Sequence, residues 1–227
     1  MKSQQELKHE SKKLLQGHIW FYFVMYLPYL VLIIGAYLML GYVHNWNFID
    51  IANDENNLGM NIAIIIGQVF MVGISYVMMD IRRNKVKFDK PIEKAFTLFN
   101  KPKYLMNVII ISLLISIFTI LWTFLFIIPG IIKAFSYSQA LYIYKDSVDR
   151  GQPMDAFACI TASRKMMDGR KMKLFWLQLS FIGWYILGIA TAGILFVYVI
   201  PYYYQTMANF YLDLAENTNI KVDDSYL

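Results

Sequence analysis

The chain has 227 residues, of which 58% are hydrophobic, 17% aromatic and only 16% charged. A typical globular domain has about a quarter charged residues, and its surface helices need a polar face that the long apolar runs here lack. The composition therefore excludes an ordinary soluble globular protein. The net charge of +5 would suit nucleic acid, but the cations lie between apolar runs, as membrane topology requires. We expect no nucleic-acid partner.

Four apolar runs are long enough to cross a bilayer. They occupy residues 19–43, 58–79, 103–145 and 172–214. A spanning helix needs about 20 mostly apolar residues, and the last two runs are twice as long as that, so each predicts a pair of helices. We therefore predict an all-α fold, a polytopic membrane helical bundle over 1–227. Its six transmembrane helices form three hairpins, each preceded by an amphipathic interfacial helix.

Each of the two longest runs contains a point where one helix ends and another begins. Pro129 and Gly130 mark the first point, because Pro is tolerated in a first helical turn, where its missing N–H would have no partner. The segment GIATAG at 188–193 marks the second. Pro201 lies inside the sixth span and removes one backbone hydrogen bond, which predicts a kink.

The distribution of charge predicts the orientation in the membrane. Lys and Arg gather in residues 1–17, 81–103 and 145–173, whereas residues 44–57 hold three acidic residues and no Lys or Arg. Basic loops mark the cytoplasmic side. We therefore expect both termini in the cytoplasm and residues 44–57 outside, with Lys133, three residues past the second hairpin's turn, reaching the outer surface.

The chain contains signs of an internal repeat. Three acidic residues each end an apolar run at intervals of 66 and 67 residues: Asp80, Asp146 and Asp213. The text SKKLLQGH at 11–18 resembles SRKMMDGR at 163–170, with Gly17 matching Gly169. We interpret the chain as three units and a polar tail, at about 1–80, 81–146, 147–215 and 216–227. Chance similarity among apolar segments is the alternative.

No catalytic constellation is recognisable. All 16 Asp and Glu fall in loops or at the ends of runs, whereas proton relays and cation pumps need buried acids. No group of His, Cys, Asp or Glu has metal-ligand spacing, and the only cysteine, Cys159, has no His near it in sequence. We expect no enzymatic activity, no catalytic residue, no metal and no cofactor.

Polar residues of the spans concentrate in the second helix of each of the last two hairpins. Polar side chains at membrane depth turn toward other helices or a wet cavity, so they suggest a ligand cavity opening toward the cytoplasmic leaflet. Its candidate lining residues are Ser136, Gln139, Tyr203, Gln205 and Asn209. The second span adds only Gln68, Ser75 and Tyr76. The alternative is hydrogen bonding between helices, worth about 0.6 kcal/mol per contact.

Residues 90–213 resemble a family of small bacterial multispanning membrane proteins, catalogued as domain of unknown function 975. The resemblance rests on IIPGIIKAFSYSQALYIYKD from residue 127, and on LSFIGW followed by T-x-G and I-P-Y in residues 179–202. It implies a protein of the bacterial cytoplasmic membrane. The family brings no activity and no functional residues with it.

Three classes of function remain open from the sequence. The first is binding or transport of a small amphiphile, lipid or antimicrobial peptide without enzymatic chemistry. The second is a structural or assembly partner of another membrane protein. The third is a lipid-modifying enzyme, because head-group chemistry is hard to recognise in one sequence. In each case the expected partners include membrane lipids.

Overall fold

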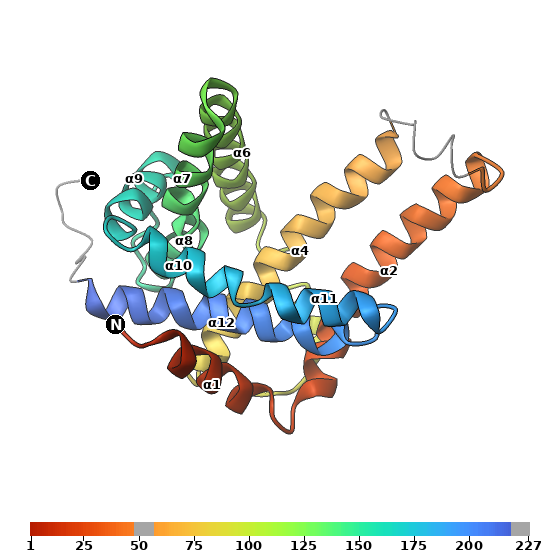
Figure 1. Cartoon of the computed structure of the whole chain (residues 1–227), viewed down its shortest axis with the longest axis horizontal. Helices are drawn as coiled ribbons and strands as arrows, with labels where there is room; N and C mark the ends of the chain where they lie inside the picture. The colour runs from red at the N-terminus through yellow and green to blue at the C-terminus, as the bar shows by residue number, and fades with distance from the viewer. Residues whose placement is uncertain (48–56, 219–227) are drawn as a thin grey trace.

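The computed structural model describes residues 1–47 and 57–218, and within these residues it contains helices and no strand (Figure 1). The all-α prediction is therefore confirmed. Most of the acidic segment predicted to face outward, and most of the polar tail, lie outside the described residues.

Each of the three predicted units contains a short helix followed by two longer arms. The first unit comprises α1 (Gln4–Leu15), α2 (Ile19–Val43) and α4 (Leu58–Arg82). The second comprises α5 (Pro91–Ala95), α6 (Pro102–Leu125), α7 (Ile127–Tyr137) and α8 (Ala140–Asp149). The third comprises α9 (Ala156–Met166), α10 (Lys171–Leu179), α11 (Ile182–Ala190) and α12 (Phe196–Asn217).

Four helical segments in the described part of the chain are long and apolar enough to cross a membrane. They are α2, α4, α6 and the combined stretch Lys171–Ala190. The buried share of the most apolar window is 17% in α2, 11% in α6 and 22% in Lys171–Ala190, whereas it is 61% in α4. Most of this apolar surface therefore faces outward, which is the arrangement that lipid stabilises and water does not.

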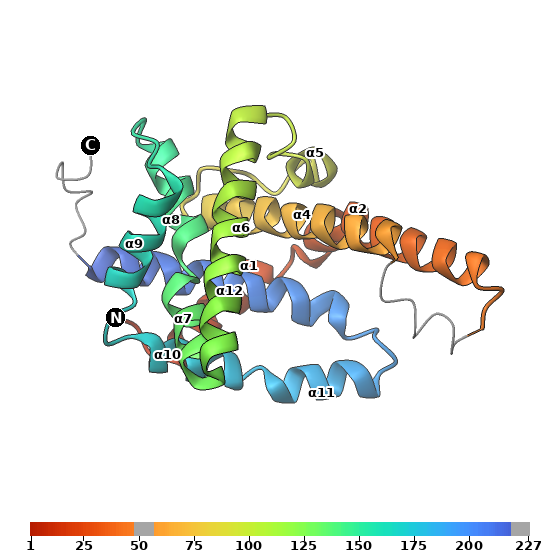
Figure 2. The same cartoon turned by 90° about the horizontal axis from the view of Figure 1, so that it is seen from above.

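The hairpins diverge from a common base. In Figure 1 the α2–α4 pair and the α6–α7 pair point away from each other, and Figure 2 shows α6 running across the direction of α4 and α12. Large apolar side chains at the tips are exposed, including Phe124 at 91%, Ile128 at 72% and Ile194 at 78%. The buried core lies where the hairpins meet, so packing energy is concentrated at the base.

Each short helix packs against the unit that precedes it in a cyclic order. Helix α5 contacts α2 and α4, α9 contacts α6, α7 and α8, and α1 contacts α12. Two serines that the proposed repeat aligns each form a hydrogen bond to the unit on which their helix packs. Asn209 of α12 donates to Ser11 of α1 at 2.9 Å, and Ser163 of α9 donates to the carbonyl of Ser136 in α7 at 2.7 Å. Helix α1 thus closes the ring.

Glycines allow the arms of two hairpins to approach closely. A Cβ on Gly130 would lie 2.1 Å from Thr123 Oγ1, and a Cβ on Gly188 would lie 2.5 Å from Phe196. The sequence predicted that the second helix begins at Pro129, whereas α6 ends at Leu125 and α7 begins at Ile127, two residues earlier than predicted. Pro129 still falls in the first turn of α7, where its missing N–H costs nothing.

The fourth predicted span is not one helix. It breaks between Tyr137 and Ala140, where α7 ends and α8 begins. The Ser163 hydroxyl bridges the break, since it accepts from the Gln139 amide at 3.1 Å and donates to the Ser136 carbonyl at 2.7 Å. A side chain from α9 therefore replaces the missing backbone pairing, which a single-segment pattern cannot reveal.

An ion-pair network ties the first two units together at the base. Arg83 donates to both carboxylate oxygens of Asp146, at 2.5 and 2.9 Å, and the Tyr211 hydroxyl donates to the same carboxylate at 2.7 Å. Lys145 pairs with Asp80 at 2.9 Å and with Asp149 at 3.0 Å. The Asp146 side chain is only 5% exposed, so the end of α4, α8 and α12 converge on one buried carboxylate.

We predict that Asp146→Asn strongly destabilises the protein. The change leaves Arg83 without its bidentate partner in a mostly buried site, a loss of about 3 kcal/mol. For a chain of this length that corresponds to a drop of roughly 6–12 °C in the melting temperature, measured on purified protein in detergent. Asp168→Asn is the control, because Asp168 is 86% exposed, and equal melting temperatures for the two variants would contradict the role of the network.

Candidate functional site

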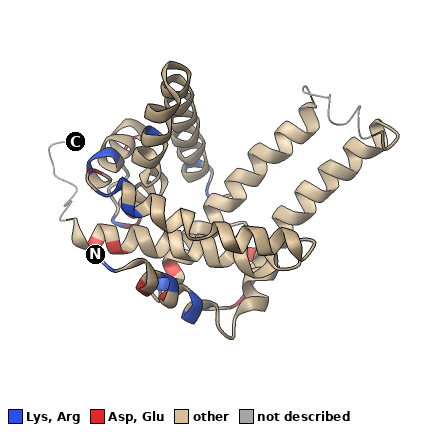
Figure 3. Ribbon diagram, viewed as in Figure 1, with Lys and Arg blue, Asp and Glu red and all other residues tan. Residues whose placement is uncertain are grey.

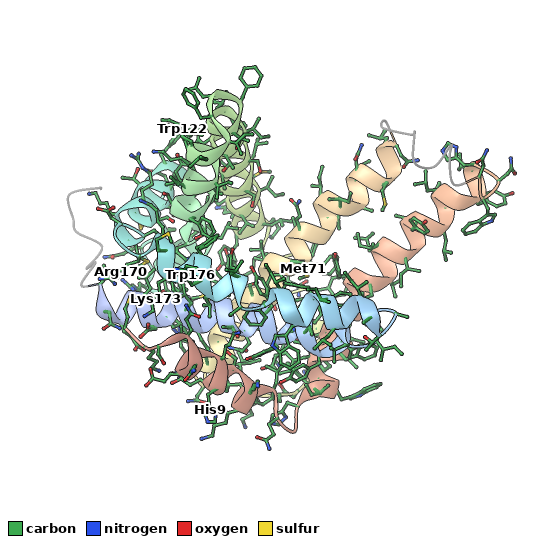
Figure 4. All side chains as sticks on the ribbon, viewed as in Figure 1. His9, Met71, Trp122, Arg170, Lys173 and Trp176 are labelled. Atoms are coloured by element: carbon green, nitrogen blue, oxygen red, sulfur yellow. The ribbon has the colours of Figure 1, made fainter. Side chains whose placement is uncertain are left out.

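A cavity of about 570 Å³ lies between the hairpins and is partly open to the surroundings. Its size falls within the range of roughly 300–1,000 Å³ typical of small-ligand sites. The lining residues come from α2, α4, α6, α12 and the α7–α8 region: Tyr29, Ile33, Ile64, Gln68, Met71, Val72, Ser75, Tyr76, Ser112, Ile115, Ser116, Ser138, Leu141, Tyr142 and Tyr204. Met71 is labelled at the centre of Figure 4.

The wall of this central cavity is mostly apolar, and the polar groups on it are uncharged. None of its lining residues is ionic at neutral pH. The hydroxyl groups of Ser75 and Ser116 donate to their own helices, at 2.8 Å to Met71 O and 2.9 Å to Ser112 O, which leaves their oxygens free to accept. The Gln68 amide makes no hydrogen bond to a described residue. The wall thus offers both donors and acceptors to a neutral hydroxyl or amide group.

Tyrosines close the cavity toward the base. The Tyr76 hydroxyl donates to Leu141 O at 2.8 Å, and the rings of Tyr142 and Tyr211 stack with centroids 5.1 Å apart. Because Tyr211 also binds Asp146, the cavity floor is joined to the base network. Tyr26 lies behind Tyr204, with ring centroids 6.5 Å apart, and its buried hydroxyl has no partner among the described residues.

The structure does not bring the five predicted cavity residues together, and none of them lines the central cavity. Ser136 and Gln139 lie at the α7–α8 break beside Ser163. Tyr203 packs its ring against Phe181 and Tyr204, with centroids 5.3 Å away in both cases. These three side chains therefore belong to two different contacts between helices.

Gln205 and Asn209 form a separate buried network. Gln205 donates to Met78 O at 3.3 Å and to Asn209 Oδ1 at 3.1 Å, and it accepts from the Tyr22 hydroxyl at 3.2 Å. Asn209 donates onward to Ser11. These amides join α12 to α1, α2 and α4, so they hold the helices together as the alternative interpretation of the polar residues proposed.

The residues that line the cavity carry a weaker signal in the sequence. Gln68, Ser75 and Tyr76 stand out only as the polar residues of the second span. Tyr204 follows Tyr203 directly, and one position on a helix turns a side chain by about 100°. The choice between these neighbours depends on how α12 is rotated against α4, and the pattern of polar residues does not encode that rotation.

The described residues contain no group of three or more His, Cys, Asp or Glu that could hold a metal ion. Cys159 lies in α9 and is fully buried. Burial, together with the nearby Asp155, raises the pKa of its thiol to about 12. Since the thiolate is the nucleophile, this side chain is poorly suited to nucleophilic chemistry at neutral pH.

We predict that Asn209→Leu lowers stability while Gln68→Leu does not. Asn209→Leu removes an acceptor from Gln205 and leaves buried polar groups unpaired, at a cost of about 2 kcal/mol. Gln68→Leu makes the same chemical change at a side chain without a partner. Thermal unfolding of both variants in detergent tests the difference, and an equal loss in both would show that Asn209 is not a structural residue.

Comparison with known proteins gives one match. No curated protein and no solved structure matches the chain. The family match begins at the first residue of α7 and ends just after α12, so it covers the third unit and the second arm of the second hairpin but less than half of the chain. The resemblance predicted from the sequence is confirmed over this part: residues 127–218 match the family described as protein of unknown function (DUF975).

Proposed function

We propose that this protein is a membrane protein that binds an uncharged amphiphile in the central cavity. One observation carries the proposal: a cavity of ligand size between apolar hairpins has a mostly apolar wall that also carries hydroxyl and amide groups and no charge. A neutral head group would hydrogen-bond to Gln68 and the serines. An apolar tail would lie against Ile33, Ile64 and Ile115.

The proposal is non-enzymatic binding in the bacterial cytoplasmic membrane. The exposed apolar arms support a membrane location. A bacterial source is what the resemblance to this family, matched over residues 127–218, implies. Because both arms of a hairpin return to the base, each unit keeps its two ends on one side of the membrane. We place the base and both termini in the cytoplasm, since the base carries the basic stretches of the sequence.

We also propose that the three units are copies of one ancestral unit. The cyclic packing of α1, α5 and α9 supports a three-fold relation. The aligned residues Ser11 and Ser163 also each hydrogen-bond to the unit on which their helix packs. Gly17 and Gly169 both have positive φ, +79° and +68°, just after their short helices, which is where a helix-ending glycine is expected.

Six parallel crossings do not fit this arrangement, and we propose two modes of insertion instead. The hairpins point in different directions, so one membrane normal cannot follow all three (Figure 2). Lys133, expected at the outer surface, lines a groove with Arg164 and Lys171 of the basic segment expected inside. The first hairpin crosses the membrane, because the polar residues of its turn are stable in the water on the far side. The second inserts obliquely, because its tip is apolar.

A second candidate function is assembly with another membrane protein. An apolar groove of about 450 Å³ runs between α2 and α4. Small residues line it, and small residues permit close helix contact in membranes. They are Gly35, Ala36, Gly59 and Ala63. This groove is separate from the central cavity. A variant that no longer binds ligand in the cavity could therefore still assemble through the groove.

Ligand binding can be tested with a photoreactive monoacylglycerol, whose head group is neutral. We predict that Ser112→Phe, which fills the cavity, lowers cross-linking at least fivefold. Leu113→Phe is the matched control, because Leu113 is the next residue on α6 and is 58% exposed outside the cavity. Cross-linked peptides should come from α4 and α12. Unchanged cross-linking in folded Ser112→Phe protein would favour the assembly function.

Cysteine labelling tests the topology. In a Cys159→Ala background, we predict that an impermeant maleimide labels Tyr42→Cys in sealed cells but labels Lys13→Cys only after lysis. Ile128→Cys, at the tip of the second hairpin, should react only with a lipid-soluble maleimide. Labelling of Ile128→Cys from outside, as fast as Tyr42→Cys, would show that the second hairpin crosses. Labelling of Lys13→Cys from outside would refute the orientation.

A further inference from the structure

A second, differently charged depression lies between α7, α9 and the start of α10. This basic groove has a volume of about 380 Å³. It is lined by Lys133, Ser136, Thr161, Arg164, Lys165, Asp168 and Lys171. Four cations therefore face one carboxylate. Figure 3 shows the corresponding concentration of Lys and Arg around α9 and the beginning of α10.

Lys133 and Arg164 of the basic groove have no carboxylate partner among the described residues, and Lys171 has only a weak one. Asp168 approaches Lys171 at 3.7 Å and is 86% exposed, so this pair is weak. Neither Lys133 nor Arg164 forms an ion pair with a carboxylate in the described residues. Arg164 and Lys171 instead repel Lys133. Like charges held together in this way are stabilised when an anion binds between them.

The start of α10 adds to the same potential. Lys171 is the first residue of this nine-residue helix, and the N-terminal end of a helix carries a partial positive charge of roughly half a unit. The groove thus combines mobile ammonium groups, the planar donor set of Arg164 and a helix end. Phosphate is the anion that such a combination binds well.

An aromatic groove continues from the basic one. It has a volume of about 280 Å³ and shares Lys133, Thr161 and Arg164 with its neighbour. Its other lining residues are Phe118, Trp122, Tyr137, Phe157 and Ile160. The Lys133 ammonium lies 4.5 Å from the centre of the Trp122 ring, so the boundary between charge and apolar surface passes through this contact. From Trp122 the surface leads to the exposed apolar tip of the hairpin.

We propose that this pair of grooves binds one anionic phospholipid. Its phosphate lies among Lys133, Arg164 and Lys171, and an acyl chain lies along Trp122, Phe118 and Phe157 toward the hairpin tip. A free phosphate would use only the basic groove, whereas the adjoining aromatic groove fits a chain attached to the phosphate. The site is separate from the central cavity, since the two share no lining residue.

The test is native mass spectrometry of the full chain released from nanodiscs that contain phosphatidylglycerol and phosphatidylcholine. The double variant Lys133→Gln/Arg164→Gln should retain phosphatidylglycerol about 30-fold less well, since each cation contributes about 1 kcal/mol. Retention of phosphatidylcholine should not change. The control is Lys13→Gln/Lys173→Gln, which removes the same charge. Lys173 lies apart from Trp122 in Figure 4 and lines neither groove.

The control pair should change phosphatidylglycerol retention by less than threefold. Equal losses in both double variants would show general surface attraction and would overturn the site, as would full retention by Lys133→Gln/Arg164→Gln. Lys133→Arg/Arg164→Lys, which keeps the charge, should restore binding if loss came from charge and not from misfolding. Displacement of the lipid by equimolar glycerol phosphate would overturn the lipid assignment in favour of a free phosphate. Monoacylglycerol cross-linking in the central cavity should be unaffected.

Discussion

The buried carboxylate of Asp146 is the point on which the arrangement of the hairpins depends. It receives Arg83 from the end of α4 and Tyr211 from α12, and it belongs to α8. A charge in so buried a place is tolerated only when its hydrogen-bonding capacity is satisfied. That requirement holds α4, α8 and α12 in one relative position at the base.

Everything beyond the base is free of such constraints, and the hairpins separate there. The short helices α1, α5 and α9 occupy the space between neighbouring units, and α12 of the third hairpin also packs directly on α4 of the first. The central cavity lies in the space that remains. Its lining carries no charge, because the ions of these helices are paired with one another at the base.

The two proposed sites differ in charge, and this difference separates their ligands. The central cavity offers hydrogen bonds without charge, which suits a neutral head group. The paired grooves beside α9 offer Lys133 and Arg164, which have no carboxylate partner among the described residues, next to aromatic rings, and this combination suits an anionic lipid. An anion in the central cavity would lose hydration without gaining a counter-ion. Lipid in the grooves would anchor the second hairpin, while the cavity stays open to a different molecule.

The sequence by itself determined the class of the protein, its helical content and its paired arms, because long apolar runs and their turns are local properties. It also predicted that Ser11 and Ser163 occupy matching positions of a repeat. Tertiary structure alone decided which polar residues face the cavity. Tyr204 lines the cavity and its neighbour Gln205 belongs to the buried network, and only the rotation of α12 against α4 decides which of the two faces the cavity. It likewise decided the place of Lys133. Its distance along the chain from the hairpin turn predicted a place at the outer surface. Packing of α9 against α7 instead places it among the cations of another unit. No periodicity within a single segment encodes a contact between segments.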